Sequence, residues 1–244
     1  MIGDDRAVSE VIAFVLVFTI IIFSVAVLST VGFSSMESYK DGEQTANADR
    51  AMVALADNLN DVARQAGIER RSGELALREG TIGTDSGATV SVEMDTGNGE
   101  EELFDDSLGR FTYTGDGDTI AYEGGTVFRI GDGGSVARAA PMATCRDGTA
   151  VLTLVVIEPT DRTVQSADSR EVRLVENRTE VRTESVETLT VTVDDDRTAT
   201  AWARALEDRG WEADVDGSTA TVEPDGDCEL EQATVRIVHV DVGY

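Results

Sequence analysis

The residue types that most often carry chemistry are few in this sequence and lie far apart. His239 is the only histidine and lies in an alternating run, which favours a strand-face residue over a general base or a metal ligand. Asp116 and Asp118 offer two carboxylates, but the spacing of an EF-hand calcium loop is absent, so we expect a solvated turn. No hydrolase, nucleotide-binding or zinc-protease motif occurs. We therefore expect no enzyme, no catalytic residue, no cofactor and no metal site.

Two further features concern covalent modification. Cys145 and Cys228 are the only cysteines, 83 positions apart, and the sequence leaves open whether they form a disulfide or stay as two free thiols. A disulfide would restrict the unfolded chain and contribute about 4 kcal/mol in the entropy model. Asn177, Arg178 and Thr179 form the only N-x-S/T sequon, so Asn177 is a candidate glycosylation site if it lies outside the cell.

The charge balance is strongly acidic. The chain has 20 Lys and Arg against 47 Asp and Glu, a net charge of -27, which excludes a nucleic-acid binder that works through phosphate contacts. Lys40 is the only lysine, and acidic residues occur throughout the chain. We interpret this as adaptation to very high salt, as in a halophile, in preference to a generic acidic protein, because molar salt screens such self-repulsion.

An uncharged stretch near the N-terminus predicts a membrane segment. Between Glu10 and Glu37 there is no ionisable side chain, and Val11–Val31 is almost entirely apolar. As a helix these 21 residues measure roughly 31 Å, the thickness of the bilayer core. A buried core helix is the alternative, but little else in the chain is apolar enough to cover it. A cleaved signal peptide is disfavoured because the leader is acidic and no A-x-A site follows.

The residues around this stretch resemble a known family. The run Asp5–Leu16, DRAVSEVIAFVL, is similar to the processing region of haloarchaeal type IV pilin-like proteins, and the resemblance covers about the first 65 residues. It implies that a prepilin peptidase cuts near Arg6 and Ala7 and leaves the apolar helix on the mature protein. Glu10 stands where the commonest haloarchaeal pattern has proline, and Arg6 rather than glycine precedes Ala7.

Glu10 has two interpretations. In bacterial type IV pilins a glutamate at the fifth mature position is thought to neutralise the N-terminal amine of a neighbouring subunit. Glu10 becomes fourth after a cut before Ala7 and fifth after a cut before Arg6. A carboxylate drawn into an apolar core needs a cation beside it, whereas one at headgroup depth stays solvated. The sequence leaves both open.

A second helical stretch follows the apolar one. Over residues 37–67 an apolar stripe recurs at spacings of three and four, which predicts an amphipathic helix continuing the first one. The stripe consists of Met52, Leu55, Ala56, Leu59, Val62, Ala63 and Ala66. Gly67 then suits a helix stop. We expect this stripe to pack on the body or on a copy of itself.

From residue 68 to residue 193 the period changes to two. Runs such as Thr89–Glu93, Thr126–Ile130 and Thr188–Val193 alternate apolar with polar residues, with Gly-rich turns between them. This predicts a mainly antiparallel β body. Ala150–Ile157 is continuously apolar and predicts a central strand buried on both faces.

The sequence pattern changes again over residues 194–244. The acidic run Asp194–Asp196 suits the start of a helix that continues to about Arg209 and stops at Gly210. Two or three further strands follow, at residues 211–215, 219–223 and 233–242. The pattern leaves open whether this segment is a separate domain or the last layer of the body.

Together these features predict an α+β chain. We expect a leader at 1–6, a transmembrane helix at 7–36, the amphipathic helix, and a β-rich body with one C-terminal helix. The predicted function is a membrane-inserted minor pilin or pseudopilin, with a cytoplasmic N-terminus and an extracellular body. Its predicted partners are the membrane, prepilin peptidase, and other pilin-like subunits or itself. The alternatives are an unprocessed single-pass receptor or adhesin and, less favoured, an anchored enzyme.

Overall fold

The computed structural model describes residues 4–65, 67–77, 80–115, 118–160 and 162–244, and no side chains at 4–10, 33–41 and 44. Ala66 and Asp116 therefore lie outside the described residues. The chain divides into two compact units, residues 1–44 and 45–244. The predicted fold class is confirmed: an N-terminal apolar helix precedes a mainly antiparallel β body with a helix near the C-terminus.

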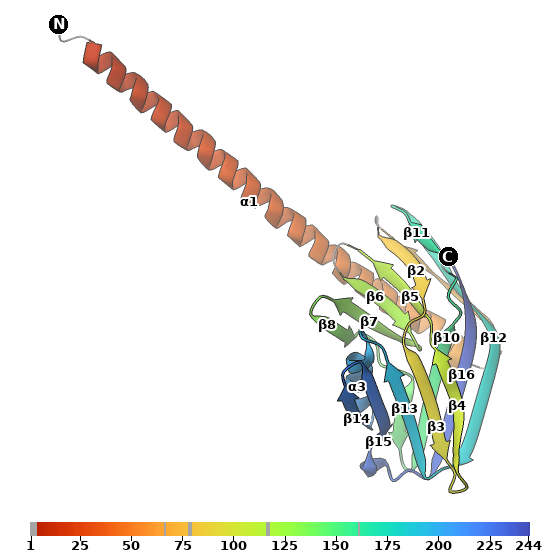
Figure 1. Ribbon diagram of the computed structural model, residues 1–244. Coiled ribbons are helices and arrows are strands. Elements are labelled where there is room, and N and C mark those ends of the chain that lie inside the picture. The colour runs from red at the N-terminus through yellow and green to blue at the C-terminus, as the bar shows by residue number, and fades with distance from the viewer. Residues whose placement is uncertain (1–3, 66, 78–79, 116–117, 161) are drawn as a thin grey trace. The chain divides into compact units, whose positions relative to one another are not determined.

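Helix α1, Asp4–Leu59, is continuous over 56 residues and passes through Gly32 and Gly42 without a break (Figure 1). It contains no proline, the residue that most strongly breaks a helix. A short helix α2, Asp61–Arg64, follows at Asn60. The chain thus reaches the first strand through almost unbroken helix, as the sequence predicts.

The predicted apolar stripe on this helix is buried. Its described members are at most 4% exposed: Met52, Leu55, Ala56, Leu59, Val62 and Ala63. Asn60 anchors the same region, because its Nδ2 donates to the Gly125 carbonyl at 2.7 Å and its Oδ1 accepts from the Tyr122 hydroxyl at 2.7 Å. The end of α1 and α2 therefore form part of the body's interior.

Three sheets make up the body. Sheet A has the strand order β1-β12-β16-β10-β9, with bounds Arg70–Ala76, Ser169–Ser185, Gln232–Gly243, Thr149–Ile157 and Ala143–Arg146. Sheet B has the order β11-β2-β5-β6-β7-β8, with bounds Thr163–Gln165, Thr81–Asp85, Arg110–Thr114, Thr119–Glu123, Thr126–Gly131 and Gly134–Ala137. Sheet C has the order β14-β15-β13-β3-β4, with bounds Trp211–Asp216, Thr219–Pro224, Thr188–Asp194, Thr89–Asp95 and Glu100–Ser107.

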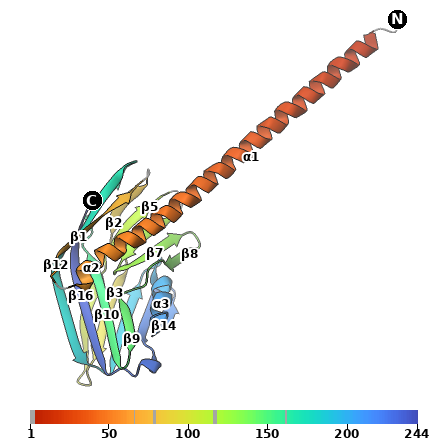
Figure 2. The same ribbon diagram turned by 180° about the vertical axis from the view of Figure 1, so that it is seen from behind.

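Two apolar cores fill the space between these layers. One joins sheet A to sheet C and to helix α3, Ala199–Glu207, through residues such as Leu154, Val191 and Trp202. The other joins sheet A and sheet B to the buried stripe of α1, through residues such as Val240 and Phe111. Seen from behind, the end of α1 and α2 lie over sheet A (Figure 2). The helix therefore takes the place of a layer in the second core.

The strands of the C-terminal segment belong to sheets A and C of the body. β14 and β15 extend sheet C beside β13, and β16 lies between β12 and β10 in sheet A. Residues 45–244 accordingly form one compact unit. The pairing of β10 with β16 is parallel, which an antiparallel meander does not include. The predicted central strand, β10, lies between β16 and β9, and its last four residues, Leu154–Ile157, are buried, together with the side chains of Ala150 and Leu152.

The β4–β5 turn brings two backbones into close contact. Gly109 has φ +64°, and a Cβ placed there would lie 1.8 Å from the carbonyl oxygen of Ile157. The neighbouring Leu108 carbonyl accepts from the Ile157 N–H at 2.7 Å. Any side chain at position 109 would therefore push sheet B away from sheet A.

Substitution of this glycine tests the close contact. We expect Gly109→Ala to lower the free energy of unfolding by roughly 3 kcal/mol or more, since it combines backbone strain with overpacking. Gly217→Ala is the matched control, because Gly217 has φ +63° with nothing within 4 Å of an added Cβ. It should cost about 1 kcal/mol, the strain alone. Equal losses in denaturant titrations of the two variants would contradict the packing account.

Candidate functional site

The first candidate is the apolar part of α1. Among the described residues one helix is long and apolar enough to cross a membrane, Val11–Gly32, with 22 residues and a mean hydropathy of 3.2 over its most apolar 18 residues. All of its side chains are exposed, including large ones such as Phe14, Phe23 and Leu28. At 1.5 Å per residue it measures about 33 Å, enough to span the apolar core of a bilayer.

Three of the four hydroxyl side chains within this segment, those of Thr19, Ser24 and Thr30, are satisfied by the helix itself. The hydroxyls of Thr19, Ser24 and Thr30 each donate to the carbonyl four residues earlier, at 2.7, 2.7 and 2.8 Å. Such bonds matter where no water is available, because an unpaired hydroxyl in hydrocarbon costs several kcal/mol, on the order of 4. These three hydroxyls are therefore compatible with an apolar surrounding.

The residues predicted for processing and assembly lie at the start of α1. Arg6, Ala7 and Glu10 belong to the helix by backbone, and their side chains lie outside the described part of the chain. Cleavage near Arg6 and Ala7, and an assembly role for Glu10, therefore stay predictions.

The two cysteines are joined. Cys145 on β9 and Cys228 in the short 3-10 turn Gly226–Cys228 form a disulfide, with their Cα atoms 5.8 Å apart. This bond links the edge strand of sheet A to the segment that leads into β16. The two cysteines lie 83 positions apart, and the structure shows the disulfide rather than the two free thiols that the sequence also allows.

Asn177 lies at an irregularity of the long strand β12. The register against β16 shifts between Glu176 and Arg178, so Asn177 has no partner residue in the ladder. Its side chain is exposed, and the Thr179 hydroxyl donates to Glu176 Oε1 at 2.6 Å. The sequon is thus presented at a β-bulge on the surface of sheet A.

His239 and Asp118 each have a cationic neighbour. Arg178 Nη2 lies 3.0 Å from His239 Nε2, which must accept because a guanidinium only donates. Partial burial and Arg178 together lower the pKa of His239 below its ordinary value. Asp118 is paired with Arg129 at 2.5 Å. In the part of the chain that the structure describes, no group of three or more His, Cys, Asp or Glu side chains is placed to hold a metal.

A buried ionic cluster, which the sequence analysis missed, lies where sheet B meets α3. Glu123 on β6 is completely buried, and its Oε1 accepts from Trp202 Nε1 at 2.8 Å and lies 3.1 Å from the Thr198 hydroxyl. Its Oε2 accepts from the Ala88 N–H at 3.0 Å and lies 3.5 Å from Arg110 Nε. Every oxygen of this carboxylate is therefore used.

Arg110, on β5, connects this carboxylate to two others. Its Nε donates to Asp85 Oδ1 at 2.9 Å, and its Nη2 donates to Asp195 Oδ2 at 3.3 Å. Asp195 also starts α3, because its Oδ1 accepts from the Arg197 and Thr198 N–H groups at 2.8 and 2.7 Å. The acidic run at 194–196 signals this helix start in the sequence, but nothing in the sequence signals its pairing with Arg110.

The two buried carboxylates have opposite pKa shifts. Burial raises the pKa of Glu123, and Arg110 and Trp202 only partly offset it. Burial also tends to raise the pKa of Asp195, but Arg110 and the hydrogen bonds of Arg197 and Thr198 outweigh it, so the net shift is downward. Because Glu123 is enclosed, the cluster serves to hold sheet B against α3.

Comparison with known proteins assigns the chain to a family. A family model described as a family of unknown function, DUF7289, matches residues 6–243. The match covers nearly the whole chain, so the chain belongs to this family. No curated protein and no solved structure matches it.

The role of Asp195 can be tested through pH. A carboxyl whose folded pKa is lowered stabilises the fold above its unfolded pKa, and this stabilisation is lost as the pH falls through the folded pKa. We expect Asp195→Asn to cost about 2 kcal/mol at pH 7, from the lost ion pair with Arg110, because the asparagine Oδ1 can still accept the two N–H bonds before α3. The cost should fall progressively as the pH drops below about 4.

Asp196→Asn is the control, because Asp196 is exposed and one residue away. It should change the free energy of unfolding by less than about 0.5 kcal/mol at either pH. The same loss in both variants at pH 7 would mean that Asp195 does not hold the cluster together.

Proposed function

We propose that this chain is a membrane-inserted, type IV pilin-like subunit of a haloarchaeal cell-surface filament or secretion-type apparatus, acting as a minor pilin or pseudopilin. Its apolar helix lies in the membrane before assembly, and its β body lies outside the cell. The activity of such a subunit is assembly.

The continuity of α1 carries the proposal. One helix is exposed and apolar over residues 11–32, and one face of the same helix is buried in the β body from Ala48 to Leu59. A helix that only anchored a body through a flexible linker would have no reason to enter that body's core. In the pilin-like family that the N-terminus resembles, one helix likewise serves both purposes.

The composition of the apolar segment supports association with other helices. In a membrane, helices associate through close packing at small residues, since lipid is as apolar as the helices are. The segment offers such residues at Ala13, Ser24, Ala26, Ser29 and Gly32. Phe14 and Phe18 stack at 6.1 Å beside them and add a larger surface.

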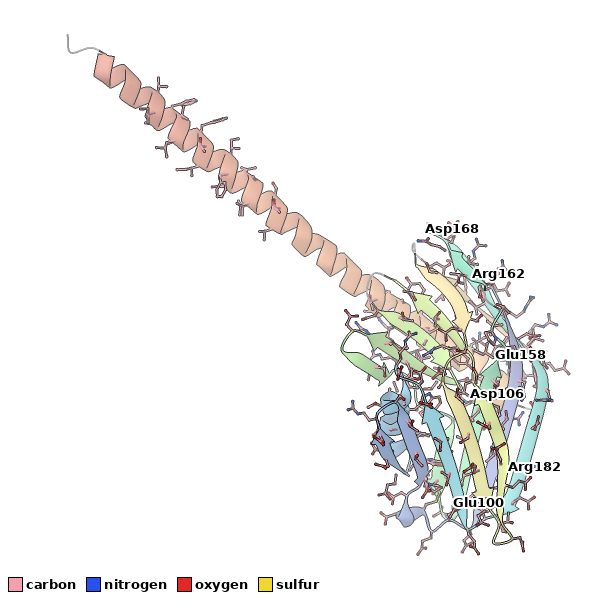
Figure 3. All side chains as sticks on the ribbon, in the orientation of Figure 1. Glu100, Asp106, Glu158, Arg162, Asp168 and Arg182 are labelled. Carbon is pink, nitrogen blue, oxygen red and sulfur yellow. A yellow bond between two sulfur atoms is a disulfide. The ribbon has the colours of Figure 1, made fainter. Side chains whose placement is uncertain are left out.

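The body has properties that suit a salty, oxidising exterior. Charged side chains cover its surface, including Glu100 and Asp106 on β4, Glu158 after β10 and Arg182 on β12 (Figure 3). The disulfide suits an extracytoplasmic location, because thiols stay reduced in most cytosols. The exposed sequon at Asn177 is also accessible to a glycosylation enzyme.

The mature N-terminus tests this function. We expect peptide mass spectrometry of the native protein, from membranes and from sheared filaments, to find an N-terminus at Arg6 or Ala7. Presence in the filament fraction would identify a subunit. An intact Met1, with all material in the membrane, would contradict the proposal and favour a single-pass anchored receptor or adhesin.

Asn177 gives a second test, of the extracellular location. We expect the native peptide that contains Asn177 to carry a glycan and to lose it in Asn177→Gln. Because Asn177 lies in a bulge and is exposed, this change should leave the unfolding midpoint unchanged. An unmodified Asn177 in native material would remove this support for the location.

A further inference from the structure

The edges of the three sheets differ in charge. An edge strand offers unpaired N–H and C=O groups to any other strand, and proteins usually protect it with charges, proline or short length. Charged residues lie in the edge strands β1, β4, β9 and β14. By contrast, β8 has the sequence Gly-Ser-Val-Ala, and Val136 at its centre is 50% exposed. β11, the other edge of sheet B, is also uncharged, but it has only three residues.

The free backbone groups of β8 can be assigned. The Arg138 N–H donates to the Val127 carbonyl at 2.7 Å, so alternate residues from 138 backward face β7. Ser135 and Ala137 therefore direct their N–H and C=O groups away from the sheet. In the described chain no other segment pairs with this edge.

A groove runs along the same edge. It has a volume of about 380 Å³ and lies between β8 and α3, with Ala201 and Ala205 on the helix side. Arg138 and Arg204 both line it, together with one carboxylate, Asp208. Arg138 is bound to Asp49 at 2.6 Å and is still 45% exposed. In a chain with a net charge of -27, this groove offers an acidic strand two cations.

The edge strand β14 has the complementary properties. Trp211 lies opposite Pro224, which has no N–H, so residues 211, 213 and 215 direct their backbone groups away from β15. Glu212, Asp214 and Asp216 alternate along one face. Val215 is 40% exposed on the other face. This strand therefore offers the unpaired backbone N–H and C=O groups of Ala213 and Val215. The carboxylates of Glu212, Asp214 and Asp216 lie next to them along the strand.

We propose that the edge of β8 in one copy pairs, antiparallel, with the edge of β14 in a second copy. Placing Ser135 opposite Val215 sets Ala137 opposite Ala213, so all the free backbone groups of both pairs find partners. The same register sets Arg138 opposite Glu212 and Val136 opposite Asp214. The contact uses the β body alone and goes beyond the proposed function of the apolar helix.

The arrangement predicts how copies combine. β8 and β14 are different surfaces, so a pair of copies still has one free β8 edge on one copy and one free β14 edge on the other. Such a heterologous contact continues into a chain or closes into a ring, depending on its rotation. It would give a filament subunit lateral contacts between bodies in addition to those between helices.

The test compares a negative and a positive side chain at the same position, 136. The full chain is kept in excess detergent micelles, at the lowest salt at which the wild type retains its far-UV circular dichroism, and its self-association is measured by sedimentation. We expect Val136→Asp, which places a carboxylate opposite Asp214, to weaken association about tenfold or more. Val136→Lys should associate as tightly as the wild type or more tightly. Loss of folding would affect both variants alike, so the contrast isolates the contact.

Two further variants complete the test. Val181→Asp is the matched control, because Val181 is 52% exposed on β12, away from both edges, and it should associate like the wild type. The double variant Val136→Asp with Asp214→Lys should recover the association that Val136→Asp loses. Equal association of Val136→Asp and Val136→Lys, or no recovery in the double variant, would overturn the pairing.

Cross-linking checks the register directly. Residues 136 and 214 form a non-hydrogen-bonded pair in the proposed ladder, where Cα atoms lie about 4.5 Å apart, within disulfide range. A mixture of Val136→Cys and Asp214→Cys chains should form an intermolecular disulfide under mild oxidation. A mixture of Val181→Cys with Asp214→Cys should not. Equal yields from the two mixtures would overturn the proposed register.

Discussion

The exposed apolar segment of α1 imposes the constraint on which the rest of the structure depends. Residues 11–32 contain no charge, and their side chains are exposed in the chain itself. Leaving such a surface in water is costly, which is why we propose that a membrane or other helices cover it. The later part of the same helix, from Ala48 to Leu59, belongs to the core formed by sheets A and B.

Inside the body, the buried cluster links sheet B to α3. Arg110 and Glu123 belong to sheet B, and Asp195 starts α3, which packs on sheet C. α3 also contacts both β8 and β14, the two edges of the proposed contact between copies. The ionic cluster and the groove beside β8 therefore both involve α3, and Glu123, the carboxylate of the cluster that bonds to α3 through Trp202, is completely buried.

Local periodicity in the sequence predicts a large part of this fold. Pairings between segments far apart in the sequence are what it does not predict. The stripe from Met52 to Ala63 and the helix ending before Gly210 follow from spacing alone. The full length of β12 is not signalled by the sequence, because beyond the bulge at Asn177 most of its side chains are exposed and many are charged, so no apolar alternation marks it. The parallel pairing of β10 with β16 joins segments about 80 residues apart, which no local signal records. The partners of Glu123 were not identified because carboxylates are frequent throughout the chain.

The central claim, that residues 11–32 lie in the membrane with the body outside, is tested most directly by external protease on intact cells. The account predicts that the body, residues 45–244, is digested from outside while a peptide that contains residues 11–32 stays in the membrane fraction. Complete protection of the body, or release of the whole chain into the soluble fraction by cell lysis, would contradict it.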